Sequence, residues 1–370
     1  MSQRFIGLMS GTSLDGVDAV LADFDGLRPT ILGHCSAPLP ASLRRELLTL
    51  NSPTDNELHR AALAGNSLAR LYADLVARLL CECGVVASTI LAVGAHGQTV
   101  RHRPQEFDET GYTLQLNNPA LLAELCGITV VADFRSRDVA AGGQGAPLVP
   151  PFHQVFFGHP DRTLAVLNIG GISNITLLDP GKRTICGFDC GPGNALMDAW
   201  CETHTGQPYD DAGRWAASGR VNADLLTRCL AEPFFAKPAP KSTGRDLFDT
   251  RWLTEKLNMA QDIAPCDVQA TLTELTALTC TRSLLEIASH CTELLVCGGG
   301  ALNTHLMNRM QVALPDCRVA STAEYGLPPL QVEASAFAWL AKQTLDGVPA
   351  SVKSVTGARG ARILGAIYPA

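Results

Sequence analysis

The sequence predicts a two-domain α/β protein in which the two halves share one architecture. An apolar run enters a glycine-rich turn and a second apolar run leaves it at residues 5–21, and the same pattern returns at residues 164–178. Such a pattern is typical of a β-hairpin. A third glycine turn, at residues 293–303, follows a strand-like run and precedes a helix-like one. Glycine turns in both halves favour a duplicated fold that holds a nucleotide in a central cleft.

Length and composition agree with this class and exclude others. The chain has 370 residues, of which 46% are hydrophobic and 18% are charged, and this favours a globular protein of two domains. The net charge of −7 argues against a nucleic-acid binder. We expect no membrane span and no signal peptide, because no apolar run has the necessary length or flanks. The thirteen scattered cysteines lack zinc spacing and indicate small buried side chains in the cytoplasm.

The first hairpin tip, within FIGLMSGTSLDGVDAVL, carries the groups that suit a phosphate. Glycines admit close backbone approach, so that N–H groups and hydroxyls point at phosphate oxygens. Asp15 and Asp18 would repel bare phosphate but fit Mg²⁺ bound between carboxylates and phosphate. Taken alone, the stretch also fits an ordinary Asp-Gly turn. The predicted nucleotide contacts here are Gly11, Thr12, Ser13, Leu14, Asp15, Gly16, Val17 and Asp18.

The other glycine turns complete the predicted nucleotide site. The second tip, within LAVLNIGGISNITLL, contributes Gly170 and Gly171. The third, within ELLVCGGGALN, contributes residues 298–300, which are Gly298, Gly299 and Gly300. A strand, bare glycine backbone and a helix start together form a place where a nucleotide can bind. These turns match neither the Walker pattern nor the dinucleotide fingerprint.

Hydrophobic periodicity places the remaining elements. We expect helices at residues 57–81, 118–127, 267–291 and 332–347, and strands at 90–100 and 128–134. The Gly/Pro-rich run 140–151 is the expected crossover between domains. Domain I then comprises residues 1–138 and 348–370, with phosphate and sugar contacts, and domain II comprises 139–347. The helix at 332–347 and the tail offer apolar surface for a possible homodimer.

Motifs along the whole chain carry a resemblance to one family. They are GLMSGTSLDGVD, GAHGQT, VVADFRSRDVAAGGQGAPLVP, LNIGGISN, GFDCGPGNALMDAW, PKSTGRDLF, CGGGALN and EYGLPP, in this order. Together they resemble the 1,6-anhydro-N-acetylmuramic acid kinase family, which belongs to the sugar kinase, Hsp70 and actin superfamily. The resemblance implies a two-domain, actin-like (ribonuclease H-like) ATPase/sugar-kinase fold, with ATP and Mg²⁺ as cofactors. The implied small-molecule partners are ATP and an anhydro-amino sugar, with no nucleic acid and no membrane.

The resemblance also assigns a catalytic base. Asp189 ends an apolar run before Gly191-Pro192-Gly193, where a carboxylate is fixed and partly desolvated. Without the family match, a turn-capping Asp is the more frequent reading of this pattern. With it, Asp189 falls on the base that deprotonates water. That water would attack the anomeric carbon of the anhydro-sugar while O6 takes the γ-phosphoryl of ATP.

Polar residues at strand and helix ends are the expected sugar contacts. His96, Gln98 and Thr99 follow an apolar strand, although a lone strand-end His is more often structural. Arg135 or Arg137 has a fork suited to the lactyl carboxylate, or to a surface ion pair with Asp133 or Asp138. Glu333 begins a helix, where it would bind sugar hydroxyls or favour the helix dipole. Lys241 and Arg245 are weaker candidates for substrate or closure contacts.

Other functions remain open from the residues alone. A kinase for another amino sugar would use the same groups. An actin- or Hsp70-like ATPase module would use only the nucleotide site, but the polar strand ends at 94–99 and 133–138 supply a second set of ligand groups. A hydrolase with Ser13 as nucleophile ranks last, because GTSLD lacks the G-x-S-x-G elbow.

Overall fold

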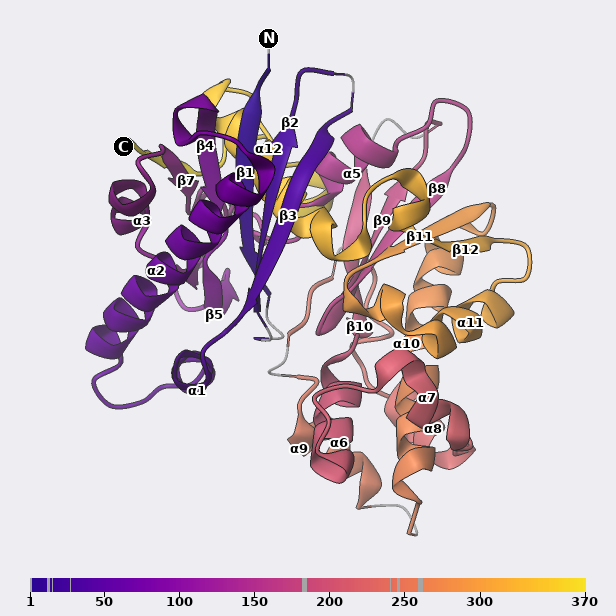
Figure 1. The fold of residues 1–370 in the computed structure, drawn as a ribbon. Helices are drawn as coiled ribbons and strands as arrows, with labels where there is room; N and C mark the ends of the chain where they lie inside the picture. The colour runs from indigo at the N-terminus through magenta and orange to yellow at the C-terminus, as the bar shows by residue number, and fades with distance from the viewer. Residues whose placement is uncertain are drawn as a thin grey trace. The chain divides into compact units, whose positions relative to one another are not determined.

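The chain forms two compact units. The computed structural model describes residues 2–11, 14, 16–26, 28–181, 185–239, 241–244, 247–258 and 262–370. Unit 1 comprises Met1–Phe156 and Gln331–Ala370, and unit 2 comprises Phe157–Leu330 (Figure 1). Each unit contains a mixed β-sheet with helices packed against it.

The sheet of unit 1 has the order β13-β7-β4-β1-β2-β3. Its strands are β1 (Arg4–Ser10), β2 (Gly16–Asp23), β3 (Thr30–Pro38), β4 (Ile90–Ala95), β7 (Val130–Ala132) and β13 (Ala366–Tyr368). The antiparallel meander β1-β2-β3 is followed by β4, parallel to β1, and by β7, parallel to β4. The hairpin predicted at residues 5–21 is therefore the β1–β2 pair.

The sheet of unit 2 repeats this topology in the order β10-β9-β8-β11-β12. Its strands are β8 (Leu164–Ile169), β9 (Ile172–Leu178), β10 (Cys186–Pro192), β11 (Glu293–Cys297) and β12 (Arg318–Ser321). Again an antiparallel meander is followed by strands parallel to its first member. A meander whose first strand pairs with later parallel strands is the ribonuclease H-like arrangement, and its presence in each unit confirms the predicted duplicated α/β fold.

Helices cover the sheet of unit 1, and one of them crosses it very closely. They are α1 (Ala41–Thr49), α2 (Glu57–Cys83), α3 (Pro119–Cys126), α4 (Ser136–Ala140), α5 (Pro150–Phe157), α12 (Val332–Leu345) and α13 (Lys353–Thr356). A Cβ at Gly7 of β1 would lie 1.8 Å from the carbonyl oxygen of Ala334 in α12. A Cβ at Gly94 of β4 would lie 2.1 Å from that of Phe337. Glycine at both positions lets α12 lie directly on the strands.

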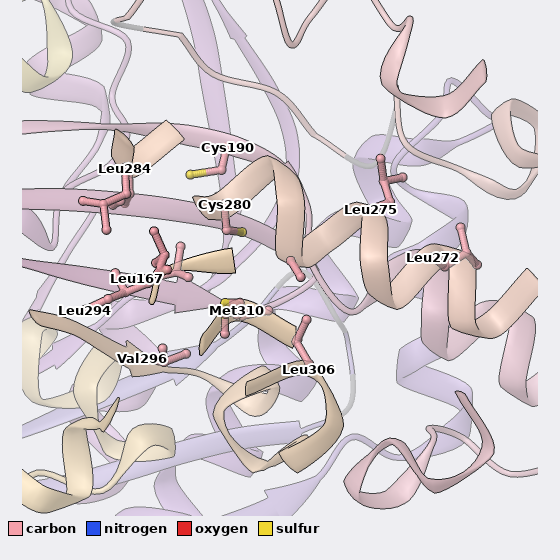
Figure 2. Packing of buried hydrophobic residues seen from close by; sticks show 14 of the residues in the cluster. Leu167, Cys190, Leu272, Leu275, Cys280, Leu284, Leu294, Val296, Leu306 and Met310 are labelled. Atoms are coloured by element: carbon pink, nitrogen blue, oxygen red, sulfur yellow. The ribbon is translucent and has the colours of Figure 1, made fainter. Parts of the chain in front are cut away.

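Unit 2 is built around a long buried helix. Its helices are α6 (Ala195–Thr205), α7 (Arg214–Ser218), α8 (Ala223–Leu230), α9 (Thr250–Leu257), α10 (Pro265–Ala288) and α11 (Thr304–Ala313). Figure 2 shows side chains of β8, β10 and β11 meeting those of α10 and α11 in the core. Cys190 and Cys280 belong to this cluster, and burial, followed by the Cys280 thiol, holds the pKa of Cys190 well above its usual range. These thiols are core groups, as the sequence predicted.

The structure differs from the sequence expectation at three places. The run predicted as a strand at 90–100 is broken at Gly97, where φ is 79°, and the chain continues as β5 (Gln98–Pro104), which pairs with β6 (Gly111–Leu116). Residues 139–156 and α12 belong to unit 1 instead of the second domain. Most of α12 is buried, so this helix does not offer the apolar surface expected for a homodimer.

The described residues include no helix that is both long and apolar enough to cross a membrane.

The Asn118 side chain caps α3 by accepting from the N–H of Leu121 at 3.0 Å, and Gly127 ends the helix in a left-handed conformation, as the sequence predicted.

We expect Gly94→Val to destabilise the protein, because its Cβ would overlap the backbone of α12. Overpacking of this kind costs about 1–3 kcal/mol, and each kcal/mol lowers Tm by about 2–4 °C in a protein of this size class. Thermal unfolding would measure the change. Gly26→Ala is the control, since its Cβ would lie 3.4 Å from the nearest atom. Equal Tm values for the two variants would contradict the close crossing.

Candidate functional site

A buried chain of hydrogen bonds joins the end of β1, at the β1–β2 tip, to α2 and to the turn after β4. Tyr72 of α2 donates its hydroxyl to Ser10 Oγ at 3.1 Å, and Ser10 Oγ donates to the carbonyl of Gly97 at 3.0 Å. Burial raises the pKa of Tyr72, so its hydroxyl remains a proton donor. Arg44 of α1 donates to the carbonyl of Leu14, which is buried in a left-handed conformation. Ser10 and Leu14, two described residues of the tip, are therefore held by side chains from two helices.

Several predicted nucleotide contacts belong to this tip. Thr12, Ser13 and Asp15 lie outside the described residues. Gly11 accepts from the N–H of Leu14 at 3.2 Å. Gly16 and Val17 open β2, and the Asp18 carboxylate accepts a hydrogen bond from His34 Nε2 at 3.0 Å. The described residues form no cluster of three or more His, Cys, Asp or Glu side chains that could bind a metal.

The turn after β4 is joined to the tip. Gln98 Nε2 donates to the carbonyl of Gly11 at 3.2 Å. Gln98 is almost fully buried, and its Oε1 has no hydrogen-bond partner among the residues that the structure describes. Thr99 Oγ1 accepts from Gln115 Nε2 of β6 at 3.2 Å. The predicted sugar-binding turn and the predicted phosphate turn thus form one hydrogen-bonded unit.

His96 is used to hold Arg135. Its Nε2 accepts from Arg135 Nε at 3.1 Å and from Arg135 Nη2 at 2.9 Å, so this nitrogen carries no proton. Burial, and after it the charge of Arg135, hold the pKa of His96 well below its usual range. The imidazole is therefore a neutral acceptor. This places it behind the guanidinium, whereas the sequence suggested a direct sugar contact, which the structure does not test.

The other side of Arg135 is held by a loop that Asp138 organises. Arg135 Nη1 donates to the carbonyl of Gly145 at 2.7 Å. Asp138 is fully buried and accepts from the N–H of Gly145 and from Thr356 Oγ1, each at 2.8 Å. Sequence reasoning considered Asp138 only as an ion-pair partner. Asp138 instead binds a backbone N–H and a side chain 218 positions away, and neighbouring residues in the sequence do not indicate such contacts.

Glu333 lies on the same face of α12 as the residue that touches His96. The Phe337 ring is 4.7 Å from the imidazole, measured between centroids. Residues four apart stack on one helix face, so Glu333 projects from that face one turn earlier. Its side chain is half-buried. Unit 1 therefore brings Gly11, His96, Gln98 and Arg135 together at the ends of β1 and β4, and Glu333 lies one helical turn from the Phe337 that contacts His96.

Asp189 of unit 2 sits at a break in the sheet register. It pairs with Asn174 of β9, but Gly191 pairs with the next residue, Ser173, so Cys190 is an extra residue in β10. Such a bulge re-aims the neighbouring side chain. The Asp189 carboxylate is half-buried, and its Oδ2 accepts from the backbone N–H of Thr243 at 2.9 Å. The backbone N–H of Asp189 donates to the carbonyl of Lys241 at 3.0 Å.

The remaining glycines of unit 2 converge on the start of α6. Asn194 donates its backbone N–H to the carbonyl of Gly170 at 2.7 Å, and Gly193 donates to that of Gly171 at 2.9 Å. A Cβ at Gly299 would lie 3.3 Å from Asn194 Nδ2. The β8–β9 tip, the start of α6 and the triple glycine are thus neighbours. Asn194 binds Gly170 and Thr243 binds Asp189, and neither contact was predicted from the sequence.

Solved structures show a remote likeness. The activator of the 2-hydroxyisocaproyl-CoA dehydratase from Clostridium difficile with bound ADPNP aligns with a TM-score of 0.47 at 14% identity, covering 94% of this chain and 98% of that chain. A ROK family glucokinase from Streptomyces griseus in complex with glucose and AMPPNP aligns with a TM-score of 0.42 at 14% identity, covering 92% and 99%.

Curated relatives are much more similar, and they share one name, anhydro-N-acetylmuramic acid kinase. The protein from Variovorax paradoxus is 62% identical, over 100% of this chain and 99% of its own length. The protein from Albidiferax ferrireducens is 61% identical over the whole of both chains, and that from Bordetella pertussis is 58% identical over 99% and 96%. The family model described as anhydro-N-acetylmuramic acid kinase matches residues 3–370. The chain belongs to the anhydro-N-acetylmuramic acid kinase family.

Proposed function

We propose that this chain is a cytoplasmic, ATP-dependent kinase of cell-wall recycling. In the proposed reaction, water opens the 1,6-anhydro bridge of anhydro-N-acetylmuramic acid and O6 receives the γ-phosphoryl group, which gives N-acetylmuramic acid 6-phosphate and ADP. The match over residues 3–370 supports the choice of substrate. The observation that carries the mechanism is the Asp189 carboxylate, held at a bulge by the N–H of Thr243.

Asp189 is the general base in this reaction. Its carboxylate takes a proton from water as the water oxygen bonds to C1 and the C1–O6 bond breaks. The electron pair left on O6 forms the bond to the γ-phosphorus, and the bond from that phosphorus to the β-phosphate oxygen breaks. Inverting glycoside cleavage normally needs a second carboxylic acid to protonate the leaving oxygen. Here the phosphoryl group captures O6, so one carboxylate suffices.

The ligand groups divide between the units. We place the ATP phosphates at the β1–β2 tip and the adenosine at Gly298–Gly300, where bare backbone permits close approach. Mg²⁺, held by Asp18 and Asp15 together with phosphate oxygens, would neutralise charge on the transferring group. The Arg135 guanidinium, fixed by His96 and Gly145, suits the lactyl carboxylate. The buried Oε1 of Gln98 and the Glu333 carboxylate suit sugar hydroxyls.

Two alternatives have their own signatures. A kinase for another amino sugar would not require a carboxylate partner for Arg135. An actin- or Hsp70-like ATPase would turn over ATP without any sugar. Measuring ATP turnover with and without anhydro-N-acetylmuramic acid, and with the analogue that lacks the lactyl group, separates the three. A rate independent of sugar supports the ATPase.

Asp189→Asn should lower kcat by about 10²- to 10⁴-fold, the usual loss when a general base is removed. The amide keeps the shape and an oxygen for the N–H of Thr243, but it cannot accept a proton from water. Steady-state kinetics measures the loss, and calorimetry should show that the sugar still binds. Turnover close to that of the wild type would end the assignment of Asp189 as the base.

Gly299→Val should raise KM for ATP more than KM for the sugar. A Cβ there meets only Asn194 Nδ2, at 3.3 Å, so the chain itself admits a side chain that would obstruct the nucleotide. Gly300→Ala is the matched control for folding, because its Cβ would lie 2.3 Å from Ile169 and should lower Tm. An equal rise of both KM values in Gly299→Val, or a loss of folding, would count against a nucleotide contact.

Turnover in ¹⁸O-labelled water should place the label on C1 of the product and none in phosphate. The anhydro-sugar has no free O6, so the bridge must open with water before or during transfer. Mass spectrometry of the product locates the label. Label in inorganic phosphate would indicate plain ATP hydrolysis, and no label at all would indicate an ordinary hydroxyl kinase; either result rejects the coupled reaction.

A further inference from the structure

Thr243, whose N–H binds the proposed base, carries a buried hydroxyl. Thr243 Oγ1 is shielded from solvent, and the residues that the structure describes supply it with no donor or acceptor. Buried polar atoms are almost always paired, and leaving one unpaired costs about 1–3 kcal/mol. Thr276 Oγ1, another buried hydroxyl of unit 2, donates to the carbonyl of Pro192 at 3.2 Å.

The backbone around Thr243 is fixed relative to Asp189. The Asp189 N–H donates to the carbonyl of Lys241 at 3.0 Å, and the Thr243 N–H donates to Asp189 Oδ2 at 2.9 Å. Lys241 is held in turn, because its Nζ donates to the carbonyl of Phe235 at 3.0 Å and lies 5.1 Å from the centre of the Phe234 ring. The residue that carries the unpaired hydroxyl is therefore the residue whose N–H binds the carboxylate.

We propose that Thr243 Oγ1 and the Asp189 carboxylate together hold the water that attacks C1. The inference rests on the proposed hydrolytic reaction. The water donates one hydrogen to Asp189 and the other to Thr243 Oγ1, which leaves an oxygen lone pair aimed at the sugar. As the bond from the water oxygen to C1 forms and the C1–O6 bond breaks, one proton passes to Asp189. Thr243 keeps its own proton and acts only by orienting the water.

This arrangement explains why a hydroxyl is placed there. A carboxylate alone restrains a water through one hydrogen, which leaves its lone pair free to rotate away from C1. A second acceptor on the same backbone segment removes this freedom, and orientation of reacting groups contributes strongly to rate. The unpaired hydroxyl costs stability in the protein alone and gains its partner when the water is in place.

The test compares Thr243→Val, which removes the hydroxyl but keeps the shape, with Thr243→Ser, which keeps the hydroxyl. Thr243→Val should lower kcat by about 10- to 100-fold with little change in either KM. Its Tm should equal or exceed that of the wild type, because an unpaired buried hydroxyl has been removed. Thr243→Ser should recover most of the rate.

Thr322→Val is the matched control. Thr322 Oγ1 is also buried without a partner among the described residues, but Thr322 belongs to a 3₁₀ turn after β12 and is not a proposed site residue. It should keep the kcat of the wild type. Unchanged kcat in Thr243→Val, or equal losses in the Val and Ser variants, would overturn the role of the hydroxyl.

The labelling experiment separates this inference from the proposed function. If wild-type turnover places no ¹⁸O on C1, the hydrolytic reaction itself is wrong. If the label is on C1 but Thr243→Val reacts as fast as the wild type, the reaction stands and only the role of Thr243 is rejected.

Discussion

The close crossing of α12 over β1 and β4 is the constraint on which the arrangement of unit 1 depends. It requires glycine at positions 7 and 94, since a Cβ at either would overlap the helix backbone. Because the helix lies so near, the Phe337 ring reaches His96 at the end of β4. His96 then meets the guanidinium of Arg135. Through His96, a helix near the C-terminus therefore helps to position Arg135, a predicted sugar-binding residue.

Unit 2 uses a different device, in which backbone groups of the loops and strand ends bind one another. The carbonyls of the β8–β9 tip accept from the start of α6, and the bulge at Cys190 turns Asp189 toward the segment that carries Thr243. Gly298 and Gly300 are required by the fold, because a Cβ would lie 2.5 Å from Asn168 Oδ1 and 2.3 Å from Ile169, respectively. Gly299 is not so constrained. Packing within unit 2 thus explains glycine at positions 298 and 300, whereas it leaves room for a side chain at Gly299.

Local sequence patterns predicted the hairpins, the long helices and the duplicated α/β fold, because hydrophobic periodicity and glycine positions depend only on residues close together in the sequence. The break at Gly97 was missed, because the polar residues 96–99 fit the end of one strand, whereas the chain continues past Gly97 as β5. The return of α12 to unit 1 was hidden as well, because its partners Gly7 and Gly94 are more than 200 positions away. In the candidate site, Gln98 and Arg135 were proposed from strand-end position and charge. The contacts of Tyr72, Asp138 and Thr243 exist only in the folded chain.

The Lys241–Thr243 segment also covers part of the edge of the unit 2 sheet. β10 is the terminal strand of its sheet, and beyond it an open row of backbone groups would invite another strand to pair. The Asp189 N–H, which points outward from that edge, is occupied by the carbonyl of Lys241. The segment therefore shields a sheet edge from self-association at the same position where it supports the carboxylate. One short segment therefore covers part of a sheet edge and also positions the carboxylate that we propose as the base.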